Sequence, residues 1–252
     1  MGEDVDEARQ TRSLPIAILA YAIALAAFLL VPPILKASIG PPQGFTAQEL
    51  VDLFTPIVVL PLAWWILDCL GGLGRRELLV FLVIAIVWVE GQAIHLATNA
   101  IGDVFSAGPA RDAFYATQAG DLDHWFDEGL GHWLWHLAWA ALSVLMLFVA
   151  SRRSASPAAS VAGMGALAVA AVAGVIQGVT FFFVTVEGET TLLGVPFSVA
   201  VVAWTVRETA RGSTNPAIRF FLVSAAVTLL AYIGWIALEG WPFAEPCAVI
   251  GC

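Results

Sequence analysis

The sequence has few charged residues, almost no lysine and no basic patch. Charged side chains make up 12% of its 252 residues, against about 25% in a typical soluble domain. Lys36 is the only lysine and the net charge is −9, which excludes a nucleic-acid-binding surface. Hydrophobic residues make up 60% of the chain, and the mean hydropathy is +0.85. This composition indicates a protein embedded in a membrane.

Cysteine is also scarce. Cys69 lies within an apolar run, where a small buried thiol is the expected role. Cys247 and Cys252 lie close together near the C-terminus and could form a disulfide in an oxidising compartment. Their spacing alone leaves that pairing open.

Long apolar runs recur from end to end. Each approaches or reaches the ~20 residues that a helix needs to cross the hydrocarbon layer. Helices are expected because the runs lack the alternation of barrel strands. The residues before the first run are mostly acidic, unlike a secretory signal, so that run is predicted to remain as a span. The predicted spans cover about residues 14–36, 50–73, 77–101, 127–150, 158–186, 190–208 and 217–239. The chain is therefore predicted to be an all-α integral membrane protein, a seven-transmembrane-helix bundle in which residues 1–252 form one domain.

Arginine is distributed unevenly around these spans. One side of the seven-span arrangement carries Arg9, Arg12, Arg75, Arg76, Arg152, Arg153, Arg207, Arg211 and Arg219. The other side has only Lys36 and Arg111. The positive-inside rule then places the N-terminus in the cytoplasm and the C-terminus outside, in a multi-pass protein of the plasma or cytoplasmic membrane. The longest connection, about residues 102–126, falls on the outer side and would be either a lid or a solvated connector.

Three of the four histidines lie in the stretch 124–136, HWFDEGLGHWLWH. His132 and His136 are four residues apart and share a helix face. The fourth histidine, His95, lies in the preceding span, which runs in the opposite direction. At ~1.5 Å per residue, His95 lies about 9 Å below the outer end of its helix, and His132 and His136 lie about 8 and 14 Å deep. His124 falls in the outer loop and is left out of the site.

Other polar residues are predicted at a similar depth. Asp127 and Glu128 lie just above the histidines and could act as a general base or orient a histidine ligand. Glu90, Asn99 and Gln177 are expected to add further polar lining. Ionisable groups inside a membrane span are costly and usually functional, so this convergence predicts a functional site.

A metal site is the favoured interpretation. His95, His132 and His136 would supply three ligands and leave a fourth position open, as in catalytic zinc sites. Zinc would activate a water and polarise a carbonyl group. Copper also accepts imidazole ligands, while haem, a proton pathway or histidines that are simply hydrogen-bonded are alternatives. Retinal binding would need a lysine well inside a span, and a di-iron membrane site would need more histidines.

At these residues the sequence resembles the superfamily of seven-span membrane hydrolases that includes the alkaline ceramidases and the adiponectin/progestin receptors. That family holds zinc with one histidine from an early span and two from a later His-x-x-x-His, assisted by a Ser and an Asp, and acts on lipid amide bonds. The segment EGQAIHLAT, residues 90–98, resembles the first element, and HWLWH, residues 132–136, resembles the second. The resemblance implies that Asp127 corresponds to the family's Asp.

The sequence departs from the family pattern in two ways. The family's histidine pair lies in the last span, whereas this pair lies in span four. The family's Ser is replaced here by Gly91 or Gln92. The resemblance is confined to residues 90–136 and is a similarity of site.

These observations together predict a zinc-dependent intramembrane hydrolase. It would act on a lipid or lipophilic amide or ester from the outer leaflet, with membrane lipid as its partner and no nucleic acid. The alternative is a non-enzymatic protein that handles copper, haem or protons, or a structural membrane protein.

Overall fold

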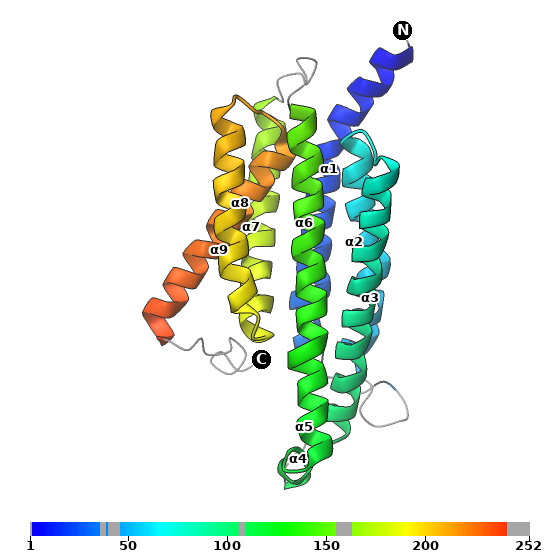
Figure 1. Cartoon of the computed structure of the whole chain (residues 1–252), viewed down its shortest axis with the longest axis vertical. Coiled ribbons are helices and arrows are strands. Elements are labelled where there is room, and N and C mark those ends of the chain that lie inside the picture. The colour runs from blue at the N-terminus through cyan, green and yellow to red at the C-terminus, as the bar shows by residue number, and fades with distance from the viewer. Residues whose placement is uncertain (1, 36–38, 40–45, 106–108, 155–162, 241–252) are drawn as a thin grey trace.

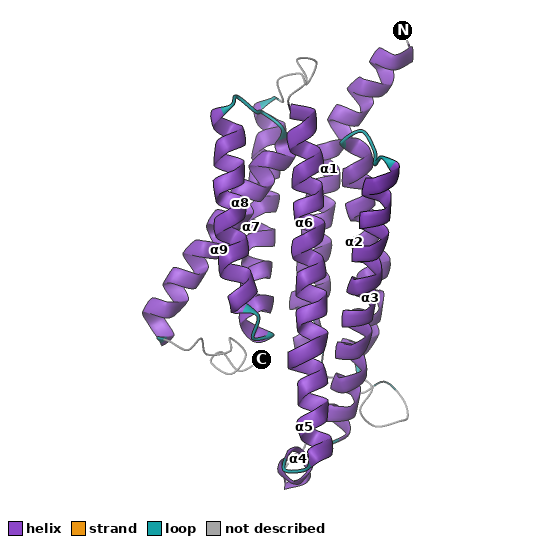
Figure 2. Cartoon of the chain, in the orientation of Figure 1, coloured by secondary structure: helices purple, strands orange, loops and turns teal. Residues whose placement is uncertain are grey.

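Long helices arranged as a bundle make up the computed structural model of the chain (Figure 1). The structure describes residues 2–35, 39, 46–105, 109–154 and 163–240, and no strand occurs in these ranges (Figure 2). The elements are α1 (Gly2–Leu30), a 3₁₀ turn η1 (Pro32–Ile34), α2 (Ala47–Cys69), α3 (Arg75–Val104), α4 (Pro109–Tyr115), α5 (Gln118–His124), a π-helix η2 (Trp125–Gly131), α6 (His132–Ser154), α7 (Met164–Glu187), α8 (Thr191–Ala210) and α9 (Pro216–Glu239).

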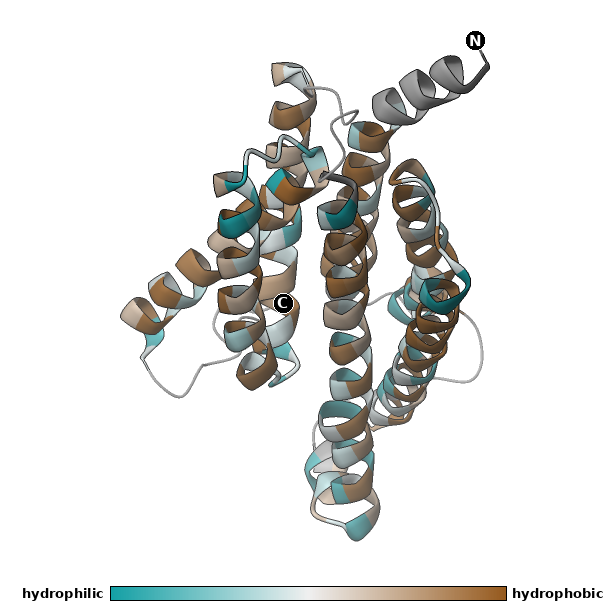
Figure 3. Ribbon diagram, turned by 45° about the horizontal axis from the view of Figure 1, so that its top comes forward, coloured by the Kyte–Doolittle hydropathy of each residue, from teal (hydrophilic) through white to brown (hydrophobic). Residues whose placement is uncertain are grey.

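Seven of these helical stretches are long and apolar enough to cross a membrane. They are Ser13–Leu30, Ala47–Cys69, Arg75–Gly102, Gln118–Arg152, Met164–Glu187, Thr191–Ala210 and Pro216–Glu239. Hydrophobic residues run along the length of these helices (Figure 3). Many of them are exposed, for example Ile86 at 61% and Leu230 at 67%, which is expected of surfaces that face lipid. The predicted all-helical fold with seven such helices is confirmed. Membrane insertion and the side on which each terminus lies remain predictions.

The structure differs from the predicted boundaries at two places. The first helix ends at Leu30 rather than near residue 36, because Pro32 and Pro33 follow and cannot extend the helical hydrogen bonding. The connection predicted for residues 102–126 is mostly helical. The Thr117 side chain accepts a hydrogen bond from the Gly120 amide and begins α5, which continues through η2 into α6 (Figure 1). His124 is therefore an exposed helical residue rather than part of a loop. Cys247 and Cys252 lie outside the described residues.

Two glycines allow α3 and α6 to approach closely near the histidines. A Cβ atom on Gly91 would lie 2.5 Å from the backbone nitrogen of Trp135 and 2.9 Å from the carbonyl oxygen of Gly131. A Cβ atom on Gly131 would lie 3.1 Å from the backbone nitrogen of His95. The two backbones touch here because neither residue has a side chain. This contact brings His95 level with His132.

Candidate functional site

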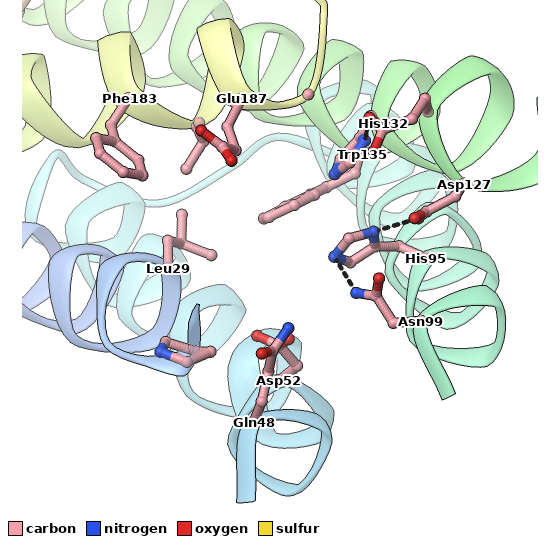
Figure 4. A pocket seen from close by; sticks show the side chains of 14 residues that line it. Leu29, Gln48, Asp52, His95, Asn99, Asp127, His132, Trp135, Phe183 and Glu187 are labelled. Atoms are coloured by element: carbon pink, nitrogen blue, oxygen red, sulfur yellow. Dashed lines mark hydrogen bonds and ion pairs between the residues drawn. The ribbon is translucent and has the colours of Figure 1, made fainter. Parts of the chain in front are cut away.

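A pocket of about 220 Å³ lies where α1, α3 and α7 end and where α2 and α6 begin (Figure 4). His95 and Asn99 of α3 line one wall, together with Asp127 of η2 and His132 of α6. Residues from the other three helices complete the wall and are described below. The pocket gathers residues from five helices, so its shape depends on the packing of the whole bundle.

His95 is held on both sides of its ring. Its Nδ1 atom donates a hydrogen bond to Asp127 Oδ1 at 2.6 Å. The Asn99 amide donates to its Nε2 atom at 3.0 Å. These two contacts are consistent with a neutral imidazole that carries its proton on Nδ1.

His132 is held in a similar way by the helical turn before it. Its Nδ1 atom lies 2.7 Å from Glu128 Oε2. The centroids of the His95 and His132 rings are 4.4 Å apart. The Trp135 ring packs against both, with centroid distances of 5.7 and 6.0 Å. The two imidazoles therefore share one small, partly aromatic site.

The η2 segment places the two carboxylates of this site. The His132 N–H bonds to the Asp127 carbonyl, five residues back, as in a π-helix. Such turns occur frequently at functional sites. Here the wider turn carries Asp127 to His95 on the neighbouring helix, while Glu128 stays with His132 on its own helix.

His136 lies one turn deeper and is fully buried. Its Nδ1 atom is 2.6 Å from Thr190 Oγ1, and its Nε2 atom is buried without a hydrogen-bond partner in the described part of the chain. Gly188 packs against the imidazole rings of His132 and His136. A Cβ atom there would lie 2.9 Å from His132 Cγ and 2.9 Å from His136 Cε1.

The three histidines share one feature. Each uses its Nδ1 atom for a side-chain oxygen, of Asp127, Glu128 or Thr190. For His132 such a bond fixes the tautomer and leaves Nε2 as the nitrogen that can bind a metal. The Nε2 atom of His95 accepts the Asn99 amide, so an ion shared by His95 and Asp127 would take the place of the proton between His95 Nδ1 and Asp127 Oδ1.

The structure groups His95, Asp127 and His132 as residues that could hold an ion. One ligand atom from each lies within 4.8 Å of the others. His136 is not part of this group, contrary to the predicted three-histidine set. His136 instead directs its Nδ1 atom to Thr190 Oγ1, at 2.6 Å, and its Nε2 atom is buried apart from this group. Asp127, predicted as a base or as a partner of a histidine, occupies the third position instead.

Of the predicted polar lining, only Asn99 lies at the pocket. Glu90 is exposed, because five residues of α-helix turn it about 140° away from His95. Gln177 is buried and lines a separate small cavity with Ser143 and Thr228. It lies about 15 Å before Glu187, the α7 residue at the pocket.

Sequence reasoning missed several residues of the site. Gln48 and Asp52 of α2 and Glu187 of α7 line the pocket, and Thr190 binds His136. Asp52 could have been found, because it is an ionisable residue near the outer end of a predicted span, the end toward which the histidines are also predicted to lie. Thr190 carries no comparable signal, since it lies in the short turn after α7.

Comparison with known proteins finds no matching family model, no matching curated protein and no matching solved structure. The resemblance to the seven-span hydrolases therefore stays a prediction.

Proposed function

We propose that the chain is a membrane-embedded metalloprotein in which His95, Asp127 and His132 hold a transition-metal ion, with zinc as the expected ion. The observation that supports this proposal is the convergence of the three side chains within 4.8 Å. Two imidazoles and one carboxylate are a donor set that catalytic zinc uses, with a position left open. The same set also suits non-haem iron.

The spacing requires only a small adjustment to bind one ion. Zinc bonds of roughly 2.1 Å place the ligand atoms of a tetrahedral site about 3.4 Å apart. The donor atoms of the group, at up to 4.8 Å, are therefore within about 1.4 Å of that arrangement. The hydrogen bond between His95 Nδ1 and Asp127 Oδ1, at 2.6 Å, would have to open to that spacing when both atoms bind the ion.

We further propose that the site hydrolyses a lipophilic amide or ester. A zinc ion bound there would polarise the carbonyl group of the substrate and make a water molecule more acidic. Glu128 is the carboxylate that we assign to accept the proton. Its Oε2 atom orients His132, and its side chain, 25% exposed, faces the pocket. Leu29, Phe183 and Val184 provide an apolar wall for the hydrocarbon part of the substrate.

A second function, proton handling, has its own supporting observation. The His95–Asp127 and His132–Glu128 pairs are already hydrogen-bonded, at 2.6 and 2.7 Å. Such pairs form proton relays within membranes and need no metal ion. The metal content of the protein separates the two functions.

Elemental analysis of the detergent-purified chain is the test. We expect about one equivalent of zinc or iron in the wild type, as one site requires, and loss of the metal in His132→Ala. His124→Ala is the matched control, because His124 is exposed on α5 and away from the pocket lining, so it should keep the metal. A wild-type protein that binds neither metal after dialysis against it would support proton handling instead. Release of fatty acid from a lipid amide by the metal-loaded wild type, and not by His132→Ala, would support hydrolysis.

A further inference from the structure

A small cavity lies between α6, α7, α8 and α9 and shares no lining residue with the pocket of the proposed metal site. Its volume is about 10 Å³. Each of the four helices contributes polar side chains to its wall, namely Ser143, Gln177, Ser198, Ser224 and Thr228. None of these residues is more than 5% exposed. Their hydrogen bonds must be made inside the bundle, because lipid offers no partners to polar groups.

The most informative of these residues is Gln177 of α7. It is 4% exposed, and its Oε1 atom is buried without a hydrogen-bond partner among the described residues. A buried acceptor that stays unpaired is costly, since it has lost its bonds to water and gained none in return. The cavity beside Gln177 is where a donor could reach this atom.

Two of the hydroxyl groups cannot be that donor. Ser198 Oγ donates to the Gly194 carbonyl at 2.8 Å. Thr228 Oγ1 donates to the Gly178 carbonyl at 3.0 Å and to a carbonyl of its own helix at 2.9 Å. A hydroxyl group has one proton, so both groups offer only lone pairs to the cavity. The cavity therefore presents acceptors on α7, α8 and α9.

One water molecule fits the volume and the chemistry of the cavity. A cavity needs at least about 10–15 Å³ to hold a water, so the observed volume of about 10 Å³ leaves room for one water and for nothing larger. That water would donate to Gln177 Oε1 and to a lone pair of Ser198 Oγ. It would accept the proton of the Ser224 hydroxyl, and buried waters commonly make about three such bonds.

A monovalent cation fits the cavity less well. The oxygen atoms of its lining side chains belong to hydroxyl groups and one amide, and no carboxylate is among them. A cation there would be a buried charge without a counter-charge, which is costly.

The site matters most for the attachment of α8. The buried residues of α8 include one hydrophobic residue, and they are Gly194, Ser198, Val201, Thr205 and Glu208. Membrane helices associate through close packing and hydrogen bonds, since burial of apolar surface provides no drive within lipid. A hydrogen bond that reaches α8 from its neighbours is therefore a substantial part of its attachment.

We propose that the cavity binds one water molecule, which joins Gln177 Oε1 of α7 to the hydroxyl groups of Ser198 on α8 and Ser224 on α9. This water holds α8 against the bundle. The proposal does not depend on the proposed function, because the cavity and the metal site have no residue in common.

Hydroxyl-radical footprinting of the full chain in detergent, with X-ray pulses and mass spectrometry, tests for the water directly. Radicals that form on a buried water label the side chains beside it. Phe181 and Phe221 line the cavity and are 3% and 2% exposed, whereas Phe220 is 1% exposed and is not among the lining residues. We expect labelling of Phe181 and Phe221 but not of Phe220, and loss of that labelling in Gln177→Met.

A double-mutant cycle tests whether the water joins the helices. Gln177→Met, Ser198→Ala and the double variant are unfolded by titration with SDS. Because one water serves both residues, the unfolding constant of the double variant should fall at least about 3-fold short of the product of the two single effects. The control pairs Gln177→Met with Thr205→Ala. Thr205 is buried on α8 and donates to its own helix as Ser198 does, but it lies outside the cavity lining, so these effects should multiply.

Three results would overturn the proposal. The first is equal labelling of the three phenylalanines in the wild type, a comparison that needs no variant to fold. The second is multiplication of the Gln177→Met and Ser198→Ala effects, as in the control pair. The third is a wild-type unfolding midpoint that rises in sodium chloride but not in choline chloride, with no such rise in Gln177→Met, which would assign the cavity to a cation.

Discussion

Gly188 offers a sensitive test of how the histidines are held. It follows α7 with φ −90° and ψ 23°, a conformation that alanine adopts without strain, so Gly188→Ala changes only the space beside the rings. The added Cβ would lie 2.9 Å from His132 Cγ, 2.9 Å from His136 Cε1 and 3.0 Å from His132 Cδ2. Ordinary carbon contacts are about 3.5–4.0 Å, so the rings must shift by about 0.5–1 Å.

A shift of that size should affect metal binding more than folding. Overpacking of this kind costs about 1–3 kcal/mol of stability, and disturbing the support of a metal ligand weakens affinity by about 10- to 100-fold. The assay is zinc competition against a chromogenic chelator, with thermal unfolding of the same samples. Gly234→Ala is the control, since a Cβ there meets nothing within 4 Å. Zinc affinity in Gly188→Ala equal to that of the control would refute the placement of His132 as a ligand.

Three further predictions follow from the same geometry. Thr190→Val removes the partner of the buried His136 Nδ1 and should lower the free energy of unfolding by about 1–3 kcal/mol, measured by denaturation, while metal content stays unchanged. Gly91→Val places a side chain 2.5 Å from the α6 backbone, so it should separate α3 from α6 and abolish metal binding, measured by equilibrium dialysis. The control is Glu90→Gln at the exposed neighbouring residue, which should leave metal binding unchanged. Metal affinity should fall as the pH is lowered from 7 to 5, because protonated imidazole cannot bind an ion. Chelator competition at each pH measures this affinity, and an affinity independent of pH would exclude histidine ligands.

The long apolar runs predicted the helices well because length and hydropathy alone define a spanning helix. The depth argument also placed His95 beside His132 correctly, since it needs only the rise per residue and opposite helix directions. The same argument grouped His136 with them as the third ligand, whereas the structure brings Asp127 to His95 and His132. That outcome depends on the π-helical turn at Trp125–Gly131 and on the backbone contact at Gly91 and Gly131, which the apolar pattern does not encode.

Glu90 and Asp52 show that the sequence does not reveal which face of a helix a charged residue occupies. Both are carboxylates within or near an apolar run, and only the rotation of each helix decides which one faces the pocket. The structure exposes Glu90 and buries Asp52 at the site. A charged residue in a span therefore signals function only after its helix face is known.

The central claim, a metal ion held by His95, Asp127 and His132, is tested most directly by zinc titration of two conservative variants. Asp127→Asn and His136→Gln each remove one member of the competing ligand sets while keeping a polar side chain in place. The structure predicts that Asp127→Asn loses at least about 10-fold in affinity and that His136→Gln keeps the affinity of the wild type. The reverse result, with the affinity lost in His136→Gln and kept in Asp127→Asn, would contradict this ligand set and favour three histidines instead.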